Sequence, residues 1–239
     1  MKIALIGYGA MGKIIETLAK EKGHSIAVVI ADNDRDSSID EIAAKLTGSD
    51  AAIDFSAADA VPRNAEAALA ARVPLIEGTT GWNAEREAIE QSVLNGDGSF
   101  IYGANFSIGV NLFYRIAGYA AELFAQFPDY EVFVEEQHHS RKKDAPSGTA
   151  MQLKAIVEEH FSQGFSVSST RAGRIPGTHR VGFDGPADQI LLEHAARSRE
   201  GFAAGAVMAA EWIVGKKGFY EFTQVIDEIL ASDRDRPRI

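Results

Sequence analysis

The first part of the chain alternates short apolar runs with longer segments of helical periodicity. Apolar, often β-branched runs predict strands over residues 2–6, 25–30, 51–55, 73–77 and 99–102. The segments between them, several rich in alanine, predict helices over residues 10–22, 57–71 and 84–94. Strands that are apolar throughout and joined by helices indicate a parallel sheet covered on both faces. We therefore predict a Rossmann-type, doubly wound α/β domain.

The pattern changes after about residue 106. Helices are expected over residues 109–127 and 148–161, and strand-like runs cover residues 130–137, 165–171, 179–183 and 189–195. Strands in succession, separated by Gly and Pro, predict a mixed or antiparallel sheet, so residues 107–202 are expected to form a second, α+β domain. Helices predicted over residues 203–214 and 224–230 return the chain to the first domain. That domain then comprises residues 1–106 and 203–239, with a frayed charged tail from residue 232.

Composition narrows the classes of function. The formal net charge of −10 disfavours general binding to nucleic acid or to a membrane surface. The chain has no cysteine, which excludes a disulfide scaffold, a thiolate zinc site and a cysteine nucleophile. We see no signal peptide and no apolar stretch long enough to span a membrane, so we expect a cytoplasmic protein.

A glycine-rich loop follows the first predicted strand and opens the first predicted helix. It has the G-x-G-x-x-G pattern, in which the glycines allow a tight turn, close approach of a pyrophosphate and close packing of helix on strand. Free amides at the helix start then face the anion. The predicted cofactor-binding residues of the loop are Gly7, Tyr8, Gly9, Ala10, Met11 and Gly12. The alternative is a glycine-rich turn in some other α/β domain.

An acidic residue is expected about 20 residues after such a loop, where it binds the adenosine ribose. Asp32 lies at that position, just past the second predicted strand. A cation near the ribose would favour NADPH, but Asn33 follows Asp32, and the nearby Arg35 has a solvent-facing orientation as its alternative role. We therefore expect NADH to be preferred, with NADPH as the alternative.

A cationic cluster precedes the helix predicted from residue 148. Its members are His138, His139, Arg141, Lys142 and Lys143. Pro146-Ser147-Gly148-Thr149 then opens the helix, where amides and hydroxyls can bind an anion. A small dicarboxylate would suit both features. The alternatives are a solvated loop and an ordinary N-cap. A zinc site is disfavoured, because the remaining histidines lack ligand spacing.

Three segments carry a resemblance to a known family. Residues 138–150, HHSRKKDAPSGTA, resemble the signature of the 4-hydroxy-tetrahydrodipicolinate (dihydrodipicolinate) reductases. Residues 77–81, EGTTG, resemble that family's G-T-T-G turn, and residues 104–111, ANFSIGVN, resemble its A-N-F-S-x-G-V-N stretch. The loop at residues 7–12 departs from the family's longer, cation-containing form, which supports the preference for NADH.

The resemblance implies an NAD(P)H-dependent reduction of (2S,4S)-4-hydroxy-2,3,4,5-tetrahydrodipicolinate to tetrahydrodipicolinate, in lysine and diaminopimelate biosynthesis. It implies that His138 is the catalytic acid/base, that Lys142 is the second catalytic cation, and that the substrate carboxylates bind to His139, Ser147, Gly148 and Thr149. It also implies that the nicotinamide end of the cofactor is lined by Gly78, Thr79, Thr80, Gly103, Ala104, Asn105 and Phe106. Residues 107–202 would then form the substrate-binding and oligomerisation domain of a homotetramer, with the active site between the domains.

Two other functions remain open. Another two-domain amino-acid or sugar dehydrogenase would share the loop at residues 7–12 but would not need the segment at residues 138–149. A non-catalytic NAD(H)-sensing module would bind the cofactor without turnover and would need neither His138 nor Lys142.

Overall fold

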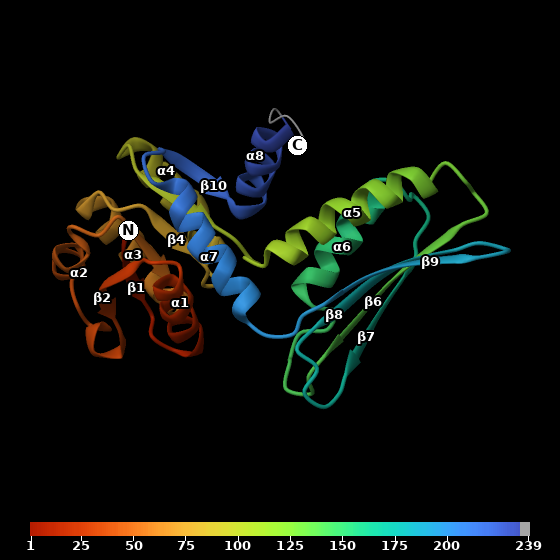
Figure 1. Ribbon diagram of the computed structural model, residues 1–239, viewed down its shortest axis with the longest axis horizontal. Helices are drawn as coiled ribbons and strands as arrows, with labels where there is room; N and C mark the ends of the chain where they lie inside the picture. Colours follow the sequence, from red (N-terminus) through yellow and green to blue (C-terminus); the bar gives the residue numbers. More distant parts are fainter. Residues whose placement is uncertain (235–239) are drawn as a thin grey trace. The chain divides into compact units, whose positions relative to one another are not determined.

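The computed structural model describes residues 1–234 and divides the chain into two compact units (Figure 1). Unit 1 comprises Met1–Ser107 and Arg199–Ile239, and unit 2 comprises Ile108–Ser198. The chain therefore leaves the first unit once and returns to it once. Residues 235–239 of the tail that we expected to be frayed lie outside the described residues.

Unit 1 is built on a six-stranded sheet in which every pairing is parallel. The strand order is β10-β5-β4-β3-β1-β2. The strands are β1 (Lys2–Ile6), β2 (Ser25–Ile30), β3 (Ala51–Asp54), β4 (Leu75–Glu77), β5 (Ser99–Tyr102) and β10 (Gly218–Glu221). The central strands β3 and β4 are buried at every position, as expected for a sheet covered on both faces.

Helices cover this sheet. They are α1 (Ala10–Glu21), α2 (Ile39–Leu46), α3 (Val61–Ala71), α4 (Arg86–Asn95), α7 (Glu200–Ile213) and α8 (Phe222–Arg234), with short 3-10 turns η1 (Asp32–Asp34), η2 (Ala58–Ala60) and η3 (Asn83–Glu85). Helices α2 and α3 pack together, and α1 packs on α7. The predicted Rossmann-type α/β fold is confirmed.

One α-helix and one strand of unit 1 were not predicted from the pattern. Helix α2 occupies a segment in which the hydrophobic pattern predicts no element, although its capping box, Ser38 with Glu41, is a recognised start signal. Strand β10 is only four residues long and runs directly into α8, so it carries too little periodicity to be recognised.

Unit 2 contains a four-stranded mixed sheet with the order β7-β6-β8-β9. Strands β6 (Glu131–His138) and β7 (Ser166–Arg171) pair parallel, whereas β8 (Thr178–Asp184) pairs antiparallel with both β6 and β9 (Gln189–Ala195). Helices α5 (Ile108–Phe124) and α6 (Gly148–Glu158) pack together over one face of the sheet (Figure 1). The predicted second α+β domain with a mixed sheet is confirmed.

Among the helices of residues 1–234, none combines the length and the apolar character that crossing a membrane would require.

Candidate active site

The glycine loop of unit 1 has the geometry that its sequence pattern requires. Gly7 has φ 84°, and a Cβ on it would lie 2.3 Å from the carbonyl oxygen of Phe55. A Cβ on Gly12 would lie 2.3 Å from the carbonyl oxygen of Gly7. A Cβ on Gly9, in contrast, would meet nothing within 4 Å. Packing therefore requires glycine at both ends of the loop, while the middle of the loop is open.

The N-terminus of α1 is suited to an anion. Its N-cap, Gly9, provides no side-chain hydrogen bond, and the first turn contains no acidic residue. Helix-terminal amides without a side-chain cap attract negative charge. The open backbone at Gly9 and the uncapped helix together fit the pyrophosphate of a dinucleotide.

The other predicted cofactor-binding residues lie at the same edge of the sheet. Asp32 opens η1 directly after β2 and is exposed. Gly78, Thr79 and Thr80 follow β4, and the segment from Gly103 to Phe106 follows β5. Since all these strands are parallel, their carboxyl ends share one edge, where doubly wound folds bind ligands.

Phe106 differs from the rest of this group. Its side chain is 2% exposed and lies 4.6 Å from the ring of Phe222 and 6.1 Å from the ring of Phe55, measured between ring centroids. It is a core residue, so it can offer a cofactor only its backbone.

In unit 2, the buried face of β6 changes from apolar to ionisable along its length. Val132, Val134, Glu136 and His138 alternate with more exposed residues and point to the same face. The alternation that builds the core therefore also carries Glu136 and His138 into the interior.

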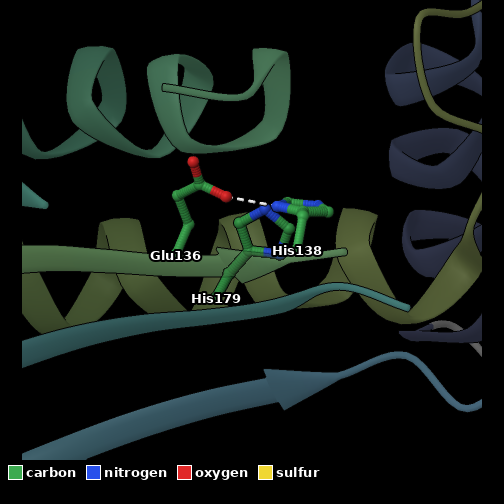
Figure 2. A group of neighbouring side chains, drawn as sticks. All are labelled: Glu136, His138 and His179. Carbon is green, nitrogen blue, oxygen red and sulfur yellow. Dashed lines mark hydrogen bonds and ion pairs between the residues drawn. The ribbon is translucent and has the colours of Figure 1, made fainter. Parts of the chain in front are cut away.

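Glu136 lies at the centre of a hydrogen-bonded network, and Figure 2 shows its contact with His138. One carboxylate oxygen pairs with Nδ1 of His138. The other accepts a hydrogen bond of 2.6 Å from Nη2 of Arg171 and one of 3.3 Å from the amide of Ser147. The carboxylate is 1% exposed, and a buried charge needs such partners to be tolerated.

These contacts set the protonation states. Burial alone would raise the pKa of Glu136, but hydrogen bonds from Arg171, Ser169 and His138 outweigh it and lower that pKa. Burial lowers the pKa of His138, and the hydrogen bond and charge of Glu136 oppose this only in part. His138 is therefore a neutral imidazole at neutral pH, and with Nδ1 facing Glu136, Nε2 is the nitrogen left to exchange a proton with a ligand.

His179, on β8, completes this cluster. It stands opposite Glu136 in the sheet, and its Nε2 lies 3.1 Å from Oγ of Ser147. Burial, reinforced by the charge of His138, lowers the pKa of His179 to about 4. One ligand atom from each of Glu136, His138 and His179 lies within 4.8 Å of the others, a spacing that a metal ion could use. The absence of a metal requirement stays a prediction. Arg171 pairs with the carboxylate of Glu136 and so supplies the positive charge that a metal ion would otherwise bring.

The loop between β6 and α6 brings the predicted cations to the same end of the sheet. Nζ of Lys142 lies 2.9 Å from a carboxylate oxygen of Asp144, and Arg171 donates to the carbonyl oxygen of Asp144. The charge of Lys142 contributes to the lowered pKa of His138, so the two groups are close enough to interact. Arg141 and Lys143 are exposed, while His139 is partly buried.

At the start of α6, Ser147 serves as the N-cap. Its hydroxyl accepts from the amide of Ala150 at 3.2 Å and contacts His179, and the residue is 2% exposed. Thr149 shares a hydrogen bond with the hydroxyl of Tyr114, whose pKa burial raises to about 12. The hydroxyls predicted to bind an anion are thus engaged within the protein, which leaves that role to the amides of the first helical turn.

Sequence reasoning missed three members of this cluster. Glu136 could have been found, because it lies two positions before His138 on an alternating strand and must share its face. Arg171 and His179 are separated from Glu136 by dozens of residues and meet it only through strand pairing.

Comparison with known proteins identifies one family over most of the chain. A family model described as "Dihydrodipicolinate reductase, N-terminus" matches residues 1–106, and one described as "Dihydrodipicolinate reductase, C-terminus" matches residues 109–226. The chain is 34% identical to the 4-hydroxy-tetrahydrodipicolinate reductase of Christiangramia forsetii, over 97% of this chain and 100% of the relative. It is 39% identical to the reductase of the same name from Methanosarcina barkeri, over 78% of this chain and 76% of the relative.

A solved structure has the same fold. It is the dipicolinate-bound dihydrodipicolinate reductase from Paenisporosarcina sp. TG-14, with a TM-score of 0.76 and 20% identity, covering 94% of this chain and 99% of that chain. At 20% identity, this similarity supports the fold alone.

Proposed function

The chain belongs to the dihydrodipicolinate reductase family, and from this we propose that it reduces (2S,4S)-4-hydroxy-2,3,4,5-tetrahydrodipicolinate to tetrahydrodipicolinate with NADH or NADPH. The reaction would serve diaminopimelate and lysine biosynthesis. The observation that carries the proposal is the Glu136–His138 pair, held beside Lys142 within the segment that resembles the family signature.

Unit 1 is proposed to bind the cofactor. The open loop at Gly9 and the uncapped start of α1 suit the pyrophosphate. The turns after β4 and β5 lie at the same edge of the sheet and are proposed to bind the nicotinamide end. Reduced nicotinamide supplies the hydride when bound.

Unit 2 is proposed to bind the cyclic dicarboxylate. The amides of the first turn of α6 suit one carboxylate, and His139 and Lys142 suit the other. Because the protein as a whole is negatively charged, this local group of cations must reverse the field where the dianion binds.

His138 is proposed to transfer the proton. Glu136 fixes Nδ1 as the protonated nitrogen, so Nε2 faces the reacting ring. A Cβ at Gly177 would lie 3.0 Å from this Nε2, so a larger residue there would crowd the nitrogen. A doubly anionic substrate would raise the pKa of His138, since negative charge stabilises imidazolium, and would thereby prepare it as a proton donor. Lys142 would stabilise negative charge as the ring accepts hydride.

NADH is proposed as the preferred cofactor. The carboxylate of Asp32, at the position expected to bind the adenosine ribose, would repel the additional phosphate of NADPH, because like charges repel. The nearby cations have other partners: Arg35 lies 4.0 Å from a carboxylate oxygen of Asp59, and Arg63 donates to carbonyl oxygens of the Arg35–Ser37 loop. Titrating the protein with NADH and with NADPH, and comparing the two dissociation constants, tests this preference.

A homotetramer that associates through unit 2 is also proposed. Strand β9 lies at the edge of its sheet and exposes Ile190 and Leu191, which are 42% and 47% exposed. An edge strand with exposed apolar side chains is suited to a second copy of the chain.

The activity is tested by generating the substrate in situ with its upstream synthase and following oxidation of NADH and NADPH by absorbance. We expect oxidation that depends on the synthase, and none with amino acids or sugars as substrates. Turnover of an amino acid or a sugar instead would indicate a different dehydrogenase. Binding of NADH without any turnover would indicate a sensing module.

A further inference from the structure

Two carboxyl groups are buried together in unit 1, away from the His138 cluster. Asp54 ends β3 and Glu77 ends β4, and the two residues stand directly opposite each other in the parallel sheet. Both are 0% exposed. Two negative charges on neighbouring strands, both shielded from water, would strongly destabilise the folded protein.

The hydrogen-bond partners of the two carboxyls in the described part of the chain are uncharged. Asp54 accepts from the amide of Ser56 at 2.9 Å and from the side-chain amide of Asn64, on α3, at 2.7 Å. Glu77 Oε1 accepts from the amide of Thr79 at 2.7 Å. Arg63 reaches the group only indirectly, by donating to the side chain of Asn64. Within residues 1–234, no Lys, Arg or His pairs with either carboxyl.

The remaining oxygen of Glu77 identifies where a proton belongs. Oε2 is buried and has no hydrogen-bond partner among the residues that the structure describes. The side chains of Asp54 and Glu77 lie within hydrogen-bonding reach of each other, so a proton on Oε2 would allow Glu77 to donate to the carboxylate of Asp54. One proton then satisfies the orphaned atom and halves the charge of the pair.

We propose that Glu77 holds a proton in the folded protein and shares it with Asp54, and that this carboxyl pair positions the Gly78–Thr80 turn for the cofactor. The role in cofactor binding rests on the proposed function. Burial and the charge of Asp54 raise the pKa of Glu77 well above its ordinary value, in agreement with this assignment. Burial also raises the pKa of Asp54, and hydrogen bonds from Ser56 and Asn64 oppose this. Both oxygens of Asp54 already accept from donors, whereas Oε2 of Glu77 does not, so the geometry assigns the proton to Glu77.

The pair connects two loops at the carboxyl edge of the sheet. The amide of Ser56, which donates to Asp54, also lies 3.0 Å from Oγ1 of Thr79, whose own amide donates to Glu77. The amide of Gly78 donates to the carbonyl oxygen of Asp54 at 2.9 Å. The loop after β3 and the turn after β4 are therefore held as one unit.

The charge of the Asp54–Glu77 pair also bears on binding of the cofactor's pyrophosphate. Phe55, between Asp54 and Ser56, is the residue against which Gly7 of the phosphate loop packs. A singly charged pair repels a pyrophosphate at this edge less than a doubly charged pair would. Glu77 is thus a positioning residue that acts through the turn and through the local charge.

Three variants test the proposal. Glu77→Gln reproduces the protonated side chain, with an acceptor for Thr79 and a donor for Asp54. Glu77→Met keeps the volume but removes both. Glu87→Gln, an exposed carboxyl on α4, is the matched control.

The proton is tested by infrared difference spectroscopy on the free protein at neutral pH. We expect the spectrum to contain a protonated-carboxyl carbonyl band that disappears in Glu77→Gln and persists in Glu87→Gln. If Glu77→Gln removes no such band, Glu77 is ionised and the proposal is overturned. This measurement needs no cofactor, so it stands even if the proposed function fails.

The positioning role is tested by the dissociation constant of NADH. We expect Glu77→Met to raise it about tenfold, the loss of one buried hydrogen bond, and Glu77→Gln to restore affinity to within about threefold of the unaltered protein. Unchanged affinity in Glu77→Met, or equal losses in both variants, would overturn the role of the shared proton. If the unaltered protein binds neither NADH nor NADPH, it is the proposed cofactor site that fails.

Discussion

At the scale of single residues, the chemistry of unit 2 depends on how one carboxylate is buried. Glu136 occupies a core-facing position of β6, where an apolar side chain would be expected. Its charge is stabilised by Arg171, by the amide of Ser147 and by His138. Removing one partner of such a network leaves the others unsatisfied, so single substitutions should have large and specific effects.

Glu136→Gln should lower kcat by about ten- to a hundredfold, because a neutral amide does not stabilise protonated His138 as the carboxylate does. Glu136 raises the pKa of His138, so its neutralisation lowers that pKa, and the limb of the pH–rate profile that reports His138 should move to lower pH. Steady-state kinetics across a pH series measure both effects. Glu135→Gln, on the opposite face of the same strand, is the control and should leave the profile in place.

Lys142→Ala should lower kcat by about a hundredfold while the dissociation constant of NADH stays the same, because the cation acts on the reacting ring. Lys143→Ala removes an exposed neighbouring cation and provides the comparison. Turnover that survives in Lys142→Ala would remove Lys142 from the mechanism.

His179 should make the protein less stable in mild acid. Its pKa falls from 6.5 to about 4 on folding, so the unfolded chain binds the proton more readily. Stability is therefore fully present above pH 6.5 and is lost as the pH falls towards about 4. Between about pH 7 and about pH 5, urea unfolding should show the unaltered protein losing about 2 kcal/mol more than His179→Gln. Equal losses in the two proteins would mean that His179 is not held neutral.

At the scale of elements, the β1–α1 junction separates two demands on glycine. Gly7 and Gly12 allow strand and helix to approach, whereas Gly9 has no neighbour that would exclude a side chain. Gly7 and Gly12 therefore serve the fold, and Gly9 is proposed to serve the ligand.

Gly9→Ala should fold with an unchanged midpoint of thermal unfolding but should raise the dissociation constant of NADH about tenfold or more, because its methyl group occupies the space of the pyrophosphate. Gly12→Ala should instead destabilise the protein by about 1–3 kcal/mol, since its Cβ would overlap the carbonyl oxygen of Gly7. Thermal unfolding and NADH titration of both variants separate these effects. A Gly9→Ala variant that binds NADH normally would contradict the proposed site.

At the scale of the whole molecule, the chain builds one unit from two separate segments and inserts the other between them. Residues from Arg199 onward return α7, β10 and α8 to unit 1, and β10 adds to the sheet beside β5. Unit 2 has its own apolar core, so it does not depend on unit 1 for burial of its sheet. It also exposes apolar side chains on β9, which is the basis for the proposed oligomer.

Leu191→Glu should reduce the mass of the particle, as measured by size exclusion with light scattering, because a charge on an apolar edge strand opposes association. Leu94→Glu, at a 51% exposed position on α4, introduces the same charge in unit 1 and should leave the mass unchanged. A monomeric unaltered protein would end the proposal of a tetramer.

Much of the fold could be predicted from the sequence because its signals are local. The alternation of apolar strands with helices, the glycine loop at residues 7–12 and the start of α6 at Gly148 each depend on neighbouring residues. The proposed catalytic residues also lie in one continuous segment, so their identity could be predicted before any contact was known.

Tertiary structure decided which groups meet and which protons they hold. Arg171 reaches Glu136 across 35 positions, and Glu77 faces Asp54 only because β3 and β4 pair in one register. Hydrophobic period and turn chemistry are properties of a few consecutive residues, whereas burial and pairing of a charge depend on segments that folding alone brings together.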